Sequence, residues 1–307
     1  MSGAANTTSM PLPTGKTSLM SQVVHLLVLA LMLVALLVLL TKFNWVHCSQ
    51  VPGNWCDIYC NTIMRSHSRI ALLYGEEGVG NAEELRWTIT NTRLNTFLEP
   101  FQIRYLTAGM LEGYDLVIVE EARTVSFSQA IALRDYLDGG GSMIWVGDSL
   151  TNLYADDVEM EKARSMDLQR VYDAEVANQN VSNPHYYENF LLNYSDTRGF
   201  NFLSDVLSAT YESTNASRNA EMKIVQRSHM MMNGLKPEID LGDVEYARVH
   251  VDPRYVSTLA VIRDGEKEYP LVFETRYSGK IVYFAYPLEA INSTTLLQNV
   301  LDYLVTC

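Results

Sequence analysis

Basic residues are scarce in this chain of 307 residues. Lys and Arg together number 23 against 36 Asp and Glu, which gives a net charge of -13 at pH 7. A nucleic-acid partner needs a basic face that neutralises phosphates, so this balance argues against nucleic-acid binding. It also argues against docking to anionic lipid through a polybasic patch.

The sequence lacks a phosphate-binding loop. Its first glycine-rich segment, residues 75–80, reads GEEGVG, without the Gly-Lys-Ser/Thr of a P-loop or the spacing of a dinucleotide fingerprint. The two glutamates would also repel a phosphate. The segment therefore predicts a plain turn between a strand and a helix.

Cysteine is also rare, and the four cysteines are Cys48, Cys56, Cys60 and Cys307. Their spacing leaves three alternatives open: disulfides at the base of an exported domain, free thiols, or a zinc site that includes His47. Disulfides are the favoured interpretation, and the zinc spacing matches no common knuckle. We expect no metal and no cofactor.

The longest apolar run spans residues 23–40 and is interrupted only by His25. At ~1.5 Å per residue its length approaches the thickness of a bilayer core. Lys42 and Trp45 fit an interfacial anchor, and no small-x-small cleavage site follows. We expect a polar leader (1–22), an uncleaved single-pass helix in the lipid bilayer (23–40) and a juxtamembrane stalk (41–68).

The orientation of this anchor follows from weaker signals. Lys16 and Lys42 flank the run on opposite sides, so the positive-inside rule does not decide. Four candidate N-glycosylation sequons lie downstream, at Asn180, Asn193, Asn215 and Asn292. Together with the cysteine cluster, they favour a C-terminal domain outside the cytoplasm.

Residues 114–149 predict a βαβ unit. An apolar run at 116–119 ends in Glu120-Glu121, and a second run at 143–146 ends in Gly147-Asp148-Ser149. Between them, Ser126 or Ser128 begins a helix that Gly139 to Gly141 stop. With a strand at 70–74, a helix at 82–98 and a strand at 101–106, the pattern predicts a doubly wound, mostly parallel α/β sheet.

The rest of the domain, taken as 69–307, has two further parts. Residues 151–218 begin with a charged helix at 156–176 and are interpreted as an insertion, which forms a docking surface or a lid. The region after it is rich in strands. They are expected at 221–226, 240–251, 258–263, 271–275 and 280–285, before a closing helix at 293–305.

Several segments resemble the class I glutamine amidotransferase-like superfamily over roughly residues 69–305, apart from the insertion. They are YDLVIVEE (114–121), LRDYLDGGGSMIWVGDS (133–149), GLKPEIDLG (234–242), GKIVYFAYPLEA (279–290) and LLQNVLDYL (296–304). The chain is most similar to two non-catalytic or weakly characterised branches. One comprises the GIFT domains of gliding-motility, intraflagellar-transport and oligosaccharyltransferase accessory subunits, and the other the trehalose-utilisation-like proteins. The resemblance implies a flavodoxin-like, amidotransferase-like sheet.

The chain departs from this family at the catalytic positions. Active members carry a cysteine at the turn after the strand that ends here at Val146, whereas this chain has Gly147-Asp148-Ser149. Their His-Pro-x-Glu motif corresponds to Tyr286-Pro287-Leu288-Glu289, without the histidine. We therefore expect a pseudoenzyme with no catalytic residue. A hydrolase that uses Ser149, Asp148 and a histidine (His185, His229 or His250) is an alternative.

Polar residues at the expected sheet edge also suggest a ligand site. Glu120, Asp148, Ser149 and Glu289 would form an acidic pocket for a cation or for sugar hydroxyls. The favoured function is a non-catalytic accessory or structural subunit that binds other membrane or envelope proteins. A carbohydrate- or ion-binding sensor is the other alternative, and a homo-oligomer is compatible with the sequence.

Overall fold

The computed structural model describes residues 19–42, 51, 55–58, 68–92, 96–195, 197–291 and 293–305. The chain divides into two compact units, Met1–Met64 and Arg65–Cys307, and each is described by itself. Three of the cysteines (Cys48, Cys60 and Cys307) and Asn292 lie outside the described residues. Of Cys56, only the backbone is described, in a short helix.

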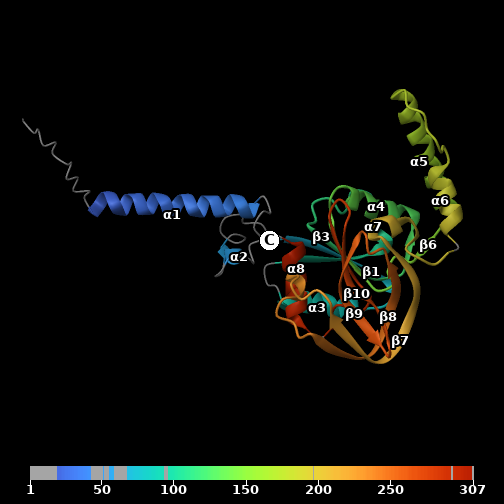
Figure 1. The fold of residues 1–307 in the computed structure, drawn as a ribbon. Helices are drawn as coiled ribbons and strands as arrows, with labels where there is room; N and C mark the ends of the chain where they lie inside the picture. Colours follow the sequence, from blue (N-terminus) through green and yellow to red (C-terminus); the bar gives the residue numbers. More distant parts are fainter. Residues whose placement is uncertain are drawn as a thin grey trace, which may run out of the picture. The chain divides into compact units, whose positions relative to one another are not determined.

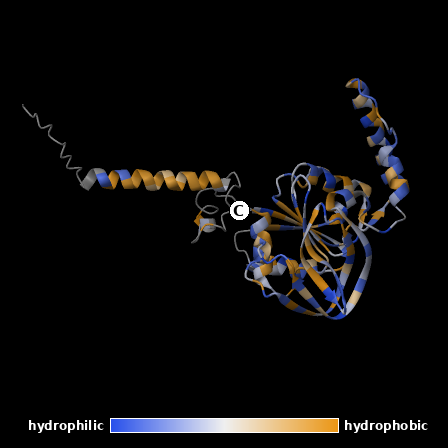
Figure 2. Ribbon diagram, in the orientation of Figure 1, coloured by the Kyte–Doolittle hydropathy of each residue, from blue (hydrophilic) through white to orange (hydrophobic). Residues whose placement is uncertain are grey.

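The first unit contains the expected apolar helix. Helix α1 (Leu19–Lys42) includes a stretch of 20 residues, Gln22–Thr41, with a mean hydropathy of 3.2, which is long and apolar enough to cross a membrane. Figure 2 shows hydrophobic residues along most of its length. A single turn, α2 (Trp55–Ile58), is joined to α1 by a hydrogen bond of 3.2 Å from the Trp55 indole to the Thr41 hydroxyl.

The second unit is built on a nine-stranded mixed sheet in the order β2-β1-β3-β5-β11-β10-β9-β7-β8 (Figure 1). The first five strands in this order are parallel: β2 (Thr96–Gln102), β1 (Ser68–Glu77), β3 (Leu116–Ala122), β5 (Ser142–Val146) and β11 (Lys280–Phe284). The other four are antiparallel: β10 (Lys267–Arg276), β9 (Val256–Asp264), β7 (Ala209–Ile224) and β8 (Glu238–Val251). A parallel pair, β4 (Thr124–Ser126) and β6 (Asn152–Tyr154), forms a second small sheet. The α/β class and the β-rich C-terminal part are confirmed, and the antiparallel strands extend the parallel sheet.

The register of the parallel strands explains why their sequences are apolar without alternation. Leu72 lies beside Ile118, Ile118 beside Ile144, and Ile144 beside Val282. All four side chains are buried, because helices and loops cover both faces of this part of the sheet. In Figure 1, α4 (Phe127–Asp138) lies above these strands and α3 (Ala82–Thr92) below them. The C-terminal helix α8 (Thr294–Leu304) packs against α3.

The serine before α4 begins that helix as expected. The Ser126 hydroxyl accepts a hydrogen bond from the backbone N–H of Gln129, and the Gln129 side chain accepts one from the backbone N–H of Ser126. This reciprocal capping box satisfies two N–H groups that the first turn would otherwise leave unpaired.

Two expected elements near Pro100 are wrong in their boundaries. The helix predicted at 82–98 ends at Thr92, and the strand predicted at 101–106 is instead β2, followed by one 3-10 turn, η3 (Ile103–Tyr105). Pro100 follows the predicted end of that helix. It lies within β2, an edge strand, where a residue without an N–H can be accommodated because one side of the strand has no neighbour.

The region after β6 is mainly helical. It contains α5 (Asp157–Val176), as predicted, then α6 (Tyr186–Tyr194), the 3-10 turn η4 (Asn201–Leu203) and α7 (Ser204–Leu207). Helices α5 and α6 pack side by side and form an arm at one end of the unit (Figure 1). The boundary expected at Arg218 falls inside β7, which begins at Ala209. One more 3-10 turn, η5 (Met230–Met232), precedes β8.

Candidate functional site

The turn between β1 and α3 gathers carboxylates from three other strand ends. The N–H of Val79 donates to Asp148 at 2.9 Å, that of Asn81 to Glu289 at 2.9 Å, and that of Ala82 to Glu121 at 3.2 Å. N–H groups at the start of a helix form an anion-binding position. In this chain the position is occupied by its own side chains.

Asp148 is fully buried and forms hydrogen bonds with several segments that are distant in the sequence. Beside the N–H of Val79, its carboxylate accepts hydrogen bonds from Arg123 Nε at 2.7 Å, Arg198 Nη2 at 2.9 Å and Thr214 Oγ1 at 3.1 Å. Two guanidinium groups oppose one negative charge, which is what a buried carboxylate requires. This side chain therefore connects the ends of β3 and β5 to the residues after α6 and to β7.

Ser149 is also fully buried, and its hydroxyl accepts a hydrogen bond of 3.3 Å from the N–H of Ala122. Its carbonyl accepts one of 2.8 Å from the indole of Trp145, whose ring packs edge-on against Phe200 with 4.8 Å between centroids. The preceding Gly147 has a φ of 60°, and a Cβ there would lie 3.0 Å from the Val79 Cβ. The turn is sealed by side chains.

The fully buried Glu120 and the half-buried Glu289 form a carboxyl pair. Both oxygens of Glu120 and one of Glu289 lack a hydrogen-bond donor among the described residues. A Cβ on Gly80 would lie 2.6 Å from the Glu120 Cγ and 2.7 Å from its Oε1. Burial, and then the charge of Glu289, raises the pKa of Glu120 well above its ordinary value, while burial also raises the pKa of Glu289. These shifts favour a neutral Glu120 carboxyl, which carries one O–H donor.

The histidines considered as partners of Ser149 have other neighbours. The Nδ1 of His229 accepts the N–H of Met231, and its Nε2 lies 3.5 Å from Glu274. His185 lies 3.2 Å from Glu188. His250 lines a hollow that does not include Ser149. The structure thus brings Asp148 and Ser149 together in one turn without a hydrogen-bonded histidine in the described part of the chain.

The described residues of this site do not include a set of metal-ligating side chains. Within the described residues, no group of three or more His, Cys, Asp or Glu side chains is arranged to hold a metal ion. The acidic residues at this edge bind backbone N–H groups, arginines or one another instead.

A cavity of about 280 Å³ lies beside the acidic residues, at the carboxyl ends of β1, β2 and β3. It is lined by Tyr74, Gly75, Glu76, Glu77, Gln102, Ile103, Arg104, Ala122, Arg123 and Thr124. Glu120, Asp148 and Glu289 are not among them. Because the chain passes from β1 to β2 on one side and continues in β3 on the other, this is a switch point of the sheet, where ligands commonly bind. The cavity can be located once the order of the strands in the sheet is known, and the sequence alone does not give that order.

No protein-family model matches this sequence, and no curated protein sequence matches it either. Solved structures do share its fold. A ThuA-like protein from Bacteroides uniformis ATCC 8492 is 12% identical over 78% of this chain and 91% of its own, with a TM-score of 0.50. A cytoplasmic protein from Salmonella typhimurium LT2 is 15% identical over 77% of this chain and 99% of its own, also with a TM-score of 0.50. The second unit therefore shares the fold of these two proteins, and at this identity the likeness extends to the fold alone.

Proposed function

We propose that this chain is a single-pass membrane protein with a non-catalytic α/β domain outside the cytoplasm, where it serves as an accessory or structural subunit of a membrane or cell-envelope complex. The main support for the absence of catalysis comes from the turn after β5, whose polar side chains are buried and already bonded within the protein. Asp148 is saturated by four hydrogen-bond donors, and Ser149 is fully buried. The hydrolase alternative has less support, because a nucleophile must reach its substrate.

Anchoring in the bilayer is supported by α1, whose apolar stretch has the length of a membrane span. The external orientation is supported by sequon placement. Asn180 and Asn193 are exposed, whereas Asn215 is half-buried in β7 and accepts a hydrogen bond of 2.8 Å from Ser213. Glycan is therefore expected first at Asn180 and Asn193.

A non-catalytic branch of the amidotransferase-like superfamily, of the GIFT or the trehalose-utilisation type, agrees with the missing cysteine and histidine. The order β2-β1-β3-β5-β11 corresponds to the 2-1-3-4-5 order of flavodoxin-like sheets, which supports the double winding that the sequence suggested.

The arm formed by α5 and α6 is the proposed docking surface for a partner subunit. Near the end of α5, Leu168, Tyr172 and Val176 are spaced four residues apart and are 72%, 62% and 69% exposed. Residues at this spacing share one helix face. An aromatic and two aliphatic side chains on one exposed face suit the buried centre of a protein interface.

Affinity purification of the full chain in a mild detergent, with mass spectrometry of the co-purifying subunits, tests this function. Leu168→Glu combined with Tyr172→Glu should abolish co-purification. The control is Trp87→Glu, which changes an exposed residue on α3 and should leave the partners in place. Recovery of a lone monomer from the native membrane, or an intact complex with the double variant, would count against the proposal.

A ligand sensor is a second candidate, supported by the cavity of about 280 Å³ at the switch point. Arg104 forms an ion pair of 3.0 Å with Glu76 there, so a small carboxylate would have to displace Glu76 from the guanidinium group in order to bind. Titration with acetate, succinate and glutamate should then raise the thermal stability of the full chain, and Arg104→Ala should remove the effect. No stabilisation by these acids would exclude a carboxylate sensor.

A further inference from the structure

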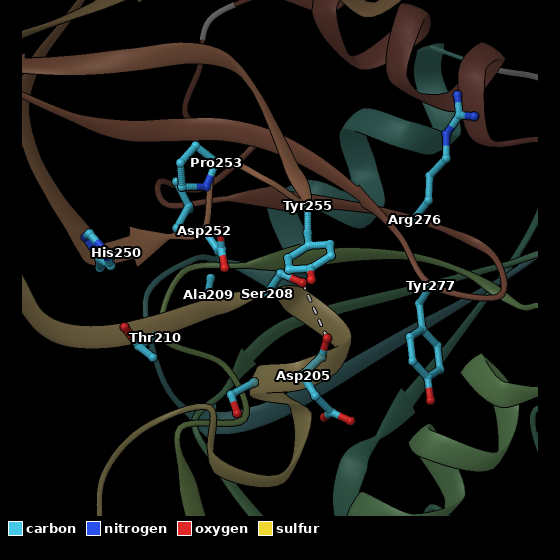
Figure 3. A pocket seen from close by; sticks show the side chains of 12 residues that line it. Asp205, Ser208, Ala209, Thr210, His250, Asp252, Pro253, Tyr255, Arg276 and Tyr277 are labelled. Atoms are coloured by element: carbon cyan, nitrogen blue, oxygen red, sulfur yellow. Dashed lines mark hydrogen bonds between the residues drawn. The ribbon is translucent and has the colours of Figure 1, made fainter.

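A larger hollow, of about 820 Å³, lies away from the acidic turn. Its lining comes from α7, the start of β7, the turn between β8 and β9, and the turn between β10 and β11 (Figure 3). Arg276 pairs with Lys280, where β11 begins, so this part of the hollow lies at the amino end of the parallel strands. The family resemblance directs attention to the opposite edge, and the hollow is therefore a separate site.

The charged side chains that line the hollow already have counter-charges. Asp205 lies 2.7 Å from Arg134, and Asp252 lies 2.7 Å from Arg254. Arg276 extends away from the other lining side chains in Figure 3, and its pKa is raised by a hydrogen bond to Tyr303 and by the charge of Glu274. A strongly charged ligand would have to break one of these pairs.

The other lining groups are hydroxyls, one imidazole and two tyrosines. The Arg254 guanidinium lies 5.5 Å from the centroid of the Tyr255 ring, and the Ser208 hydroxyl donates to the carbonyl of Asp205 at 3.4 Å. Tyr255 and Tyr277 are 65% and 40% exposed, and the ring of Tyr255 projects over the segment from Asp205 to Ser208 (Figure 3). Thr210 and His250 lie beside each other, as their strands pair directly. A sugar ring presents C–H groups on its faces and hydroxyls around its rim. The negative face of a tyrosine ring attracts such C–H groups, and the surrounding polar side chains exchange hydrogen bonds with the hydroxyls.

The floor of the hollow is held in an unusual backbone conformation. Ser208 has a φ of 52°, in the left-handed region, and its carbonyl accepts a hydrogen bond of 3.0 Å from the N–H of Asp252. The adjacent Leu207 is fully buried, which fixes this segment against the core. Ser208 is the C-cap of α7, and the left-handed conformation at this position ends the helix and turns the chain into β7.

We propose that this hollow binds a neutral saccharide of one or two rings, stacked on Tyr255 and Tyr277. Its volume lies within the range of small-molecule sites, ~300–1,000 Å³. Because the charged side chains of the lining are paired with other residues, a polar but uncharged ligand is favoured. The tyrosine rings favour a ligand that has flat C–H faces. The proposal is independent of docking through α5 and of the cavity at the switch point.

The test is saturation-transfer difference NMR with the full chain in lipid nanodiscs, so that no glycosidic detergent competes. The probes are maltose, cellobiose, lactose and N,N′-diacetylchitobiose. At least one disaccharide should receive saturation from the protein. Tyr255→Ala and Tyr277→Ala should each weaken binding by about tenfold, which is the size of one aromatic stacking contact.

Tyr255→Phe should retain binding because it keeps the ring face. Tyr172→Ala is the matched control, since Tyr172 is as exposed as Tyr255 but belongs to α5. Thermal unfolding of each variant confirms that it is folded, and if an alanine variant does not fold, Thr210→Val supplies the loss-of-contact measurement. Saturation transfer to none of the four sugars would overturn the proposal. Binding by the folded Tyr255→Ala and Tyr277→Ala variants that is as strong as binding by the unaltered chain would also overturn it.

Discussion

Glu120 and Glu289 act on each other's protonation, and two further carboxylates influence them. Glu121 and Glu84 add negative charge around Glu120, and Glu84 also acts on Glu289. With burial as the largest cause, these charges keep Glu120 protonated above its ordinary pKa of 4.5. A neutral carboxyl can then donate to Glu289, which the N–H of Asn81 holds in place.

This pair makes folding stability depend on pH. A carboxyl whose pKa is raised by folding contributes its full stability below its unfolded pKa and loses it as the pH rises through its folded pKa. In urea unfolding of the full chain, the contribution of this pair to stability should therefore fall as the pH rises above about 4.5. Glu120→Gln, which always carries a donor, should flatten this decline and stabilise the protein by about 1–3 kcal/mol at neutral pH. Glu112→Gln, at an exposed site, is the control; an unchanged slope in Glu120→Gln would show that the Glu120 carboxyl is not the cause.

Residues of this site were only partly evident from the sequence. Strand-end positions identified Glu120, Asp148 and Glu289, since polar residues after apolar runs gather at one edge. The two arginines that neutralise Asp148 were not predicted. Arg198 lies 50 positions from Asp148 in the chain, and no local pattern indicates which distant side chain will reach a buried carboxylate.

Helix α5 can be predicted from the sequence more readily than helix α6. Asp156 caps α5 locally by accepting the N–H of Glu159 at 2.8 Å, and this helix was predicted. Helix α6 was not predicted, because its cap comes from α5. The buried Asp167 accepts the N–H of Tyr187 at 3.1 Å and that of Glu188 at 3.0 Å. A cap supplied by another helix leaves no signature next to the helix that it begins.

Removal of this cap should loosen α6 selectively. Asp167→Ala leaves the N–H groups of Tyr187 and Glu188 without an acceptor and should cost about 1–2 kcal/mol. Hydrogen exchange monitored by mass spectrometry should show faster exchange in residues 186–194 and unchanged exchange in β3 and β5. Asp173→Ala on the exposed side of α5 is the control and should change stability by less than about 0.5 kcal/mol. Unaltered exchange of α6 in Asp167→Ala would mean that side-chain packing alone holds the helix.

At the scale of the whole molecule, the chain combines an apolar helix with a separate compact α/β unit. The apolar helix was predicted most securely, because length and composition suffice to identify it. The antiparallel half of the sheet was predicted as strands without an order, since pairing between distant strands depends on contacts that periodicity does not encode.

The anchor predicts a simple fractionation result. Leu29 and Leu33 lie on one exposed face of α1. Replacement of both by Arg costs about 3 kcal/mol each near the centre of a span and should convert a carbonate-resistant membrane protein into an extractable one. Leu168→Arg in α5 is the control and should remain carbonate-resistant. Carbonate resistance of the double variant would place the membrane attachment elsewhere in the chain.

The buried ring of Trp145 also gives the protein an optical property. Its indole is sealed between Phe200 and Tyr283 and bonded to the carbonyl of Ser149, whereas Trp87 is 68% exposed. In a variant with Trp45 and Trp55 replaced by Phe, acrylamide or iodide should therefore quench Trp87 and spare a short-wavelength emission from Trp145. That protected emission is a built-in fluorescent reporter of the turn after β5, and it will change when a ligand, a partner or a mutation disturbs the packing there.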